Sequence, residues 1–194
     1  ELDLLAGAGA LGRLGGHRHQ AHWQAAAIEE PRPLFDRAES AAAQLLHDAV
    51  ELPAPGEAED LAQDYRSIGL TLGRHPLALL RTRAPFAGCR SAHQLQALNS
   101  GRFVRVAGLV TGRQRPGTAS GVLFLTLEDE TGNINVVVWR DRQERFRKAL
   151  LRGKLLLVKG VMESRDSVVH VIAGEILDHS AALGALQTRS RDFH

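Results

Sequence analysis

The 194-residue sequence predicts an α+β chain, in which a small helical region precedes a five-stranded β-barrel. Two observations lead to this fold class. Up to about residue 50 the chain is rich in Ala and Gly, with apolar residues at helical spacing, whereas from Arg102 onward short runs alternate apolar and polar positions. We therefore expect a helical region over 1–50, a connector with short helices over 51–100, the barrel over 101–178 and a C-terminal tail over 179–194.

The first region is expected to hold short helices around a glycine turn. Gly15 and Gly16 follow a helical stretch, and residues 17–28 then continue without a breaker until two prolines. A second amphipathic helix is expected over 37–50. Beyond the Pro- and Gly-containing stretch 52–56, the connector has a predicted helix over 57–70, and an apolar run near residue 80 precedes an irregular segment around Pro85 and Gly88.

The second half predicts five strands and one helix. The expected strands are 103–110, 122–128, 133–140, 154–163 and 167–177, and the helix is 141–151. Residues 111–121 (TGRQRPGTASG) are expected to form a flexible loop, and the acidic hairpin 129–132 (DETG) places Gly132 where a positive φ is needed.

This order of strands and helix is that of an OB-fold, a small Greek-key barrel that binds single-stranded nucleic acid on its second and third strands and adjoining loops. By alternation, Leu123, Leu125 and Leu127 on the second strand, and Ile134, Val136 and Val138 on the third, should fill the barrel. Phe124, Thr126, Asn135, Val137 and Trp139 then face outward.

Five residues are candidates for nucleic-acid binding. Phe124 and Trp139 could stack on bases, while Arg113 and Arg115 in the long loop and Arg165 in a shorter one could contact phosphates. The structural alternatives are that Phe124 packs against other apolar groups and that Trp139 packs under the following helix. The basic run from Arg140 to Lys148 could likewise be an ordinary solvated helix face.

Charge is unevenly distributed along the chain. Residues 1–99 hold nine basic and twelve acidic side chains, whereas residues 100–178 hold thirteen and nine. Arginine provides 21 of the 24 basic residues. Its planar guanidinium suits phosphates and bases, so the basic half favours a nucleic-acid partner, although a high arginine content also follows from genomic base composition.

Membrane and secreted classes are not favoured by the sequence. No apolar run approaches the ~20 residues that cross a bilayer, no signal peptide is visible, and Cys89 is the single cysteine, so we expect a cytoplasmic protein without a disulfide or a membrane contact. The only methionine is Met162, from which we expect the sequence to be a fragment or a processed product.

No catalytic or metal-binding constellation is expected in this chain. Glu128, Asp129 and Glu130 are the only clustered carboxylates of the basic half, and their position at a hairpin is ordinary turn chemistry. His17, His19 and His22 lack a neighbouring cysteine or carboxylate to complete a metal site. We predict no catalytic residue, no metal ligand and no cofactor.

Five strings occur in an order that resembles a known family. They are AGALGRLGGHRHQAHW (8–23), IGLTLGRHPL (68–77), VRVAGLVTGRQR (104–115), FLTLEDETGNINVVVW (124–139) and GKLLLVKGVME (153–163). Together they resemble the C-terminal part of the bacterial C-family DNA polymerases, the polymerase III alpha subunits. The resemblance covers nearly the whole chain.

The resemblance implies a DNA polymerase as the parent protein, which extends a primer with two magnesium ions bound in a palm domain upstream of this region. It implies that the first string ends a helix-hairpin-helix region contacting duplex DNA and the sliding clamp, and that the OB domain holds the single-stranded template. This region alone should be inactive.

Two departures from the replicative enzymes point to one branch of the family. Their clamp-binding peptide begins with glutamine, whereas here the closest match is PRPLF (31–35), in which Leu34 and Phe35 could be degenerate clamp anchors. The chain also stops soon after the barrel, which resembles the error-prone, damage-inducible translesion branch, whose members act in repair with accessory proteins. The alternatives are a stand-alone OB-fold single-strand-binding protein and a protein-interaction scaffold that binds no DNA.

Overall fold

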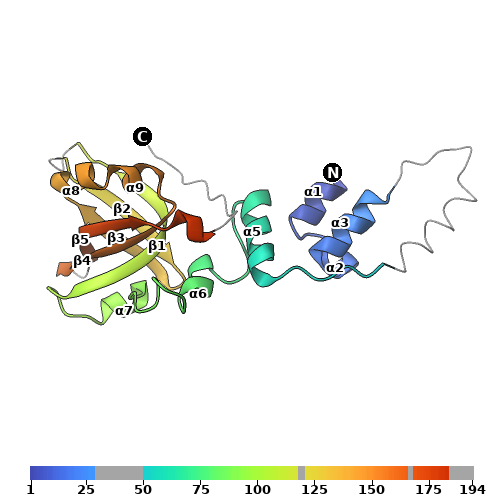
Figure 1. Cartoon of the computed structure of the whole chain (residues 1–194), viewed down its shortest axis with the longest axis horizontal. Helices are drawn as coiled ribbons and strands as arrows, with labels where there is room; N and C mark the ends of the chain where they lie inside the picture. Colours follow the sequence, from blue (N-terminus) through green and yellow to red (C-terminus); the bar gives the residue numbers. More distant parts are fainter. Residues whose placement is uncertain (29–49, 118–120, 166–167, 184–194) are drawn as a thin grey trace, which may run out of the picture. The chain divides into compact units, whose positions relative to one another are not determined.

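The computed structural model describes residues 1–28, 50–117, 121–165 and 168–183 (Figure 1). Contacts group the chain into two compact units, Glu1–Thr71 and Leu72–His194. The predicted helix over 37–50, apart from Val50, and the candidate clamp anchors Leu34 and Phe35 lie outside the described residues. The predicted domain boundaries stay a prediction.

Four short helices occur in the described residues of the first unit. They are α1 (Leu2–Gly7), α2 (Gly12–Gly15), α3 (Arg18–Ala26) and α5 (Glu57–Ser67). Gly16, with φ of 82°, separates α2 from α3, which confirms the predicted glycine turn.

Helix α3 is fastened to the chain that follows residue 50. The His17 ring nitrogen Nε2 hydrogen-bonds to the carbonyl of Leu52 at 2.8 Å, and the Arg18 guanidinium forms ion pairs with Asp60 and Asp64 of α5. These contacts join α5, which the sequence placed in the connector, to the N-terminal helices.

The second unit is a closed five-stranded barrel. Its strands are β1 (Phe103–Gln114), β2 (Leu123–Asp129), β3 (Gly132–Val138), β4 (Leu155–Arg165) and β5 (Val168–Asp178). They close in the order β1-β2-β3-β5-β4, and every pairing is antiparallel except β3 with β5. The predicted OB-fold is confirmed.

The barrel interior is filled as the strand alternation predicts. Leu125, Leu127 and Ile134 are at most 2% exposed, and Leu123 packs against the same cluster from a partly buried position. The other core residues come from β1, β3, β4 and β5 and from two helices, α7 (Ala92–Gln96) and α9 (Arg147–Arg152). They include Val104, Val106, Val136, Val138, Leu150, Val158, Met162, Val171 and Ile176.

Short helices cover the outside of the barrel. They are α6 (Pro76–Leu80), α7 (Ala92–Gln96), α8 (Arg140–Arg145), α9 (Arg147–Arg152) and a 3₁₀ turn, η1 (Ser180–Leu183). Figure 1 shows α8 and α9 on one side of the barrel and α7 on the opposite side. Helix α7 was not predicted, although Ser91 and Gln94 form the capping box that would have indicated it.

Two sequence expectations were wrong in this unit. The single helix expected over 141–151 is interrupted at Phe146, whose φ and ψ of −108° and 21° are not helical and whose ring packs against the barrel core. The loop expected over 111–121 begins later, because β1 continues through Gln114. Its extra residues pair with β2, as in Arg113 with Leu125 and Gln114 with Phe124.

Candidate nucleic-acid interface

The outer face of β2 and β3 carries polar and aromatic side chains. Thr126 lies directly opposite Asn135, and Phe124 lies opposite Val137. Phe124 and Thr126 are half-buried and Asn135 is exposed, whereas Val137 is 8% exposed. Phe124 therefore lies on the outer face, as predicted, and retains part of its ring surface for another contact.

Trp139 follows β3 and precedes α8. It occupies the N-cap position of α8 with extended backbone angles, and its side chain is 52% exposed. Trp139 is therefore not buried beneath the helix, and its part in binding stays a prediction. A large, exposed aromatic ring at the edge of the β2–β3 face is a suitable surface for base stacking.

Arg113 lies in β1, so its expected place in a flexible loop is wrong. Its Nε donates to the carbonyl of Leu150 at 2.7 Å, and its Nη2 donates to the carbonyl of Gly153 at 2.5 Å. These carbonyls belong to the C-terminal end of α9, where unpaired acceptors and the helix dipole favour a cation. Arg113 thus anchors α9 to β1.

Arg115 is tied to α8 through Gln143, a residue that the sequence analysis missed. Arg115 Nη2 donates to Gln143 Oε1 at 2.5 Å. The Gln143 amide in turn donates to the carbonyls of Gly121 and Val138, at 2.7 and 2.9 Å. Gln143 is 8% exposed, so this buried amide connects the two ends of the β1–β2 loop region with the start of α8.

Arg165 is the last residue of β4, where its backbone pairs with Val168 of β5. Its side chain lies outside the described part of the chain. The structure therefore places the Arg165 backbone at the β4–β5 turn, near the position expected, and the role of its side chain stays a prediction.

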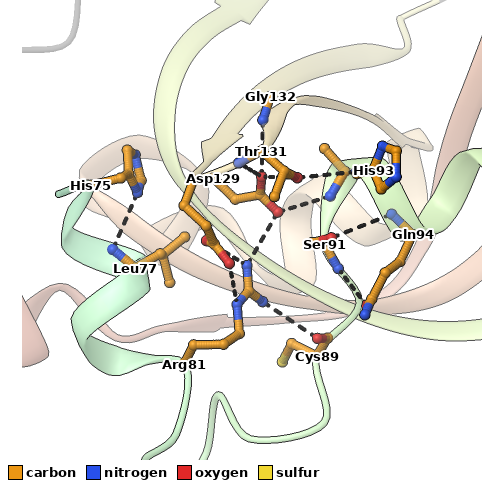
Figure 2. A network of polar contacts seen from close by, with 12 residues as sticks. His75, Leu77, Arg81, Cys89, Ser91, His93, Gln94, Asp129, Thr131 and Gly132 are labelled. Carbon is orange, nitrogen blue, oxygen red and sulfur yellow. Dashed lines mark hydrogen bonds and ion pairs between the residues drawn. The ribbon is translucent and has the colours of Figure 1, made fainter.

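Asp129 organises the hairpin between β2 and β3 (Figure 2). Its Oδ1 accepts hydrogen bonds from the backbone and hydroxyl of Thr131, at 2.7 and 2.8 Å, and from the backbone of Gly132 at 3.1 Å. Its Oδ2 accepts from the backbone of Ala92 at the start of α7, at 2.8 Å. The fully buried carboxylate therefore fastens the hairpin to α7.

Arg81, at the end of α6, completes this network (Figure 2). It donates to both carboxylate oxygens of Glu130, at 2.8 and 2.7 Å, and to Asp129 Oδ2 at 3.1 Å. Burial lowers the pKa of Arg81, but the hydrogen bond and charge of Glu130, with Asp129, outweigh it and hold the pKa above its ordinary value. The carboxylates of Asp129 and Glu130 therefore hold the hairpin against α7 and Arg81.

Two further groups near this network have shifted pKa values. Burial lowers the pKa of His75, against the opposing effect of Glu128 and other acidic neighbours, and His75 Nδ1 caps α6 by accepting from the backbone of Leu77 at 3.2 Å. Burial raises the pKa of the Cys89 thiol, which therefore lacks the thiolate character of a nucleophile.

No group of three His, Cys, Asp or Glu side chains suited to a metal ion occurs among the residues that the structure describes. His17 and His19 bond to backbone carbonyls of Leu52 and Pro53, and His22 bonds to Asp3 at 2.8 Å.

Within the described ranges, no helix is long and apolar enough to cross a bilayer.

The fold and this surface define the class of protein. Residues 104–178 match the family model described as "OB-fold nucleic acid binding domain", and so the barrel is a domain of that class.

Over its whole length the chain is homologous to bacterial error-prone DNA polymerases. It is 54% identical over 194 residues to the error-prone DNA polymerase of Saccharophagus degradans, covering 100% of this chain and 18% of the relative. It is 53% identical over 202 residues to that of Teredinibacter turnerae, covering 100% and 19%. The chain thus spans less than a fifth of the length of these relatives.

One solved structure with a similar region is the asparaginyl-tRNA synthetase of Pyrococcus horikoshii complexed with asparaginyl-adenylate. The two are 22% identical, with a TM-score of 0.43, over 54% of this chain and 23% of that one.

Proposed function

We propose that this chain is the template-holding and partner-docking region of an error-prone DNA polymerase that acts in translesion synthesis and repair in the cytoplasm. The similarity of the whole chain to part of such polymerases supports the parent activity, since the matched regions are 50 to 54% identical. On this proposal, nucleotide addition with two magnesium ions takes place in parts of the parent enzyme outside this chain.

The barrel would hold single-stranded template on the outer face of β2 and β3. The observation that carries this proposal is the exposed side chain of Trp139, which directly follows β3. It lies two residues beyond Val137, the partner of the half-buried Phe124 on β2. Bases could stack on these rings whatever their sequence, and Arg115 and Arg165 would lie beside the strand. Arg113 would contribute by positioning α9.

Accessory translesion proteins and the sliding clamp would be further partners of the parent enzyme. Exposed apolar side chains of the first unit, such as Leu4 and Leu14, at 75% and 85% exposed, are available to a protein partner. Leu34 and Phe35 remain the proposed clamp anchors, acting directly or through an accessory protein.

Tryptophan fluorescence tests template binding directly. The chain has two tryptophans, so a Trp23→Phe variant leaves Trp139 as the only reporter. Adding oligo-dT at low salt should quench the fluorescence of Trp139. The logarithm of the association constant should fall linearly with the logarithm of the salt concentration, with a slope of about −0.7 per phosphate contacted.

A binding variant completes the test. Trp139→Leu should weaken binding of fluorescein-labelled oligo-dT by about fivefold or more, because a stacked base contributes about 1 to 3 kcal/mol, whereas Trp23→Phe should bind as the parent chain does. Absence of binding at low salt would overturn the template-holding role and favour an interaction scaffold. A start codon directly before the Glu1 codon would instead favour a stand-alone OB-fold protein.

A further inference from the structure

A cleft of about 310 Å³ lies beside the first residues of β1. Its lining includes Gly88, Arg90, Arg102, Phe103 and Arg105. The volume is at the lower end of the range of small-molecule sites.

The cleft has an excess of positive charge. Arg90 and Arg102 are exposed and Arg105 is half-buried, and no carboxylate lies within ion-pair distance of these three arginines in the described ranges. The cleft lining contains no acidic residue. Three arginines that line one cleft without a carboxylate partner among the described residues favour an anionic ligand.

The backbone around the cleft is held in place by several contacts. The Arg90 backbone N–H donates to the Arg105 carbonyl at 2.7 Å, and Arg105 Nη2 donates to the carbonyl of Ala87 at 2.7 Å. Gly88 has φ of 82°, and a Cβ there would lie 3.3 Å from Arg105 Nη2. Glycine at 88 therefore lets the chain turn closely against that guanidinium.

Phe103 adds an aromatic surface to this basic cleft. Its side chain is 68% exposed although it lies in the first position of β1. Its partner on β4 is Val161, which is 39% exposed. An exposed phenyl ring among arginines has the composition of a surface that stacks a base and pairs with the adjoining phosphates.

The strand register connects Phe103 with the proposed template surface. Residues that are directly paired face the same side of a sheet, so one outward row crosses all five strands. We call it the outer apolar row, and it consists of Phe124, Val137, Ile172, Val161 and Phe103. Aromatic residues thus lie at both ends of this row, and arginines flank the Phe103 end.

We propose that the basic cleft at Phe103 is a second contact site for single-stranded nucleic acid, with a base stacked on Phe103 and phosphates at Arg90 and Arg102. This inference rests on the proposed template-holding function and extends it. A strand bound at the Trp139 end continues along the outer apolar row to the cleft, so the binding site is longer than the β2–β3 face alone.

Oligonucleotide length and salt dependence test the second site. The 194-residue chain is titrated with oligo-dT of about 8 and about 20 nucleotides. The shorter lies within, and the longer exceeds, the site sizes of about 4 to 16 nucleotides common for an OB-fold. Phe103→Ala should weaken binding of the longer oligonucleotide about five- to tenfold and leave the shorter one, held at the Trp139 end, within about twofold. Arg90→Gln/Arg102→Gln should lower the salt slope for the longer one by about 1.4, or 0.7 per lost contact.

Matched controls separate the two levels of the proposal. Phe103→Leu, which keeps an apolar side chain but removes the ring, should behave as Phe103→Ala, and Arg66→Gln, in the other compact unit, should leave the slope unchanged. If the unmodified chain binds both oligonucleotides and the cleft variants change neither affinity nor slope, the second site is refuted while the proposed function stands. If the unmodified chain binds neither, the proposed function fails first.

Discussion

Replacing Asp129 should destabilise the barrel more than replacing any other acidic residue of the hairpin. Its carboxylate has no exposed surface and accepts five hydrogen bonds. In Asp129→Ala the exposed Thr131 and Gly132 donors can turn to water, but the Ala92 N–H is buried and loses its partner. An unpaired buried donor costs about 1 to 3 kcal/mol.

The remaining ion pair between Arg81 and Glu130 limits the free energy of unfolding that Asp129→Ala can remove. Because Glu130 still binds Arg81 through two hydrogen bonds, the guanidinium is not left without a counter-charge, and the full penalty of breaking a buried ion pair does not apply. We expect a loss of about 3 kcal/mol for Asp129→Ala and about 1 to 2 kcal/mol for Asp129→Asn, which keeps one acceptor oxygen.

Two neighbouring carboxylates provide the controls. Glu130→Gln keeps one acceptor oxygen for Arg81, and Asp129 remains its counter-charge, so this change should cost about 1 kcal/mol or less. The Glu128 side chain has no hydrogen bond or ion pair with a described residue, and Glu128→Gln should change stability by less than about 0.5 kcal/mol.

Urea unfolding measures this series. Trp139 fluorescence in a Trp23→Phe background follows the barrel unit specifically, and the midpoint and slope give the free energy of unfolding. If Asp129→Ala costs less than about 1 kcal/mol, or if Glu130→Gln costs as much as Asp129→Ala, the view of Asp129 as the central acceptor is refuted.

Two further predictions concern pH and packing. His75 has a folded-state pKa below its unfolded value of 6.5, so the unfolded chain binds the proton more readily and stability should fall as pH drops through 6.5 toward the folded-state value. His75→Asn keeps an N-cap acceptor and should reduce this pH dependence in urea titrations between about pH 7.5 and 5. An equal pH dependence in both chains would contradict this prediction. Gly160→Ala should destabilise the barrel by about 3 kcal/mol or more, because the new Cβ would lie 2.1 Å from the Ile172 carbonyl oxygen. Thermal unfolding measures this effect against the control Gly117→Ala, in which no described atom lies within 4 Å of the new Cβ. Equal unfolding temperatures of the two variants would show that the strands can move apart.

The strands could be predicted from sequence because their signal is local. Alternating apolar residues place Leu125, Leu127 and Ile134 inside the barrel, and the glycine of the hairpin, Gly132, has the expected positive φ of 146°. Each of these features depends on neighbours within a few positions.

The polar contacts could not be predicted because their partners are distant in sequence. Arg81 lies 49 residues from Glu130, and Arg113 lies 37 residues from the Leu150 carbonyl that it binds. An arginine in a glycine-rich stretch has the same local pattern whether it faces solvent or a helix end. The places of the aromatic residues in the fold, which strand alternation determines, were therefore predicted better than those of the arginines.

The parallel pairing of β3 with β5 has a consequence for how the barrel moves. It joins the strands through only three residue pairs, from Asn135–His170 to Val137–Ile172, whereas β4 and β5 pair along ten. Local opening begins where the fewest backbone bonds must break, so amide hydrogen exchange in the native barrel should be fastest along this seam. Its last pair, Val137 and Ile172, belongs to the outer apolar row. A nucleic-acid strand bound across that row would contact both β3 and β5 and so slow this opening.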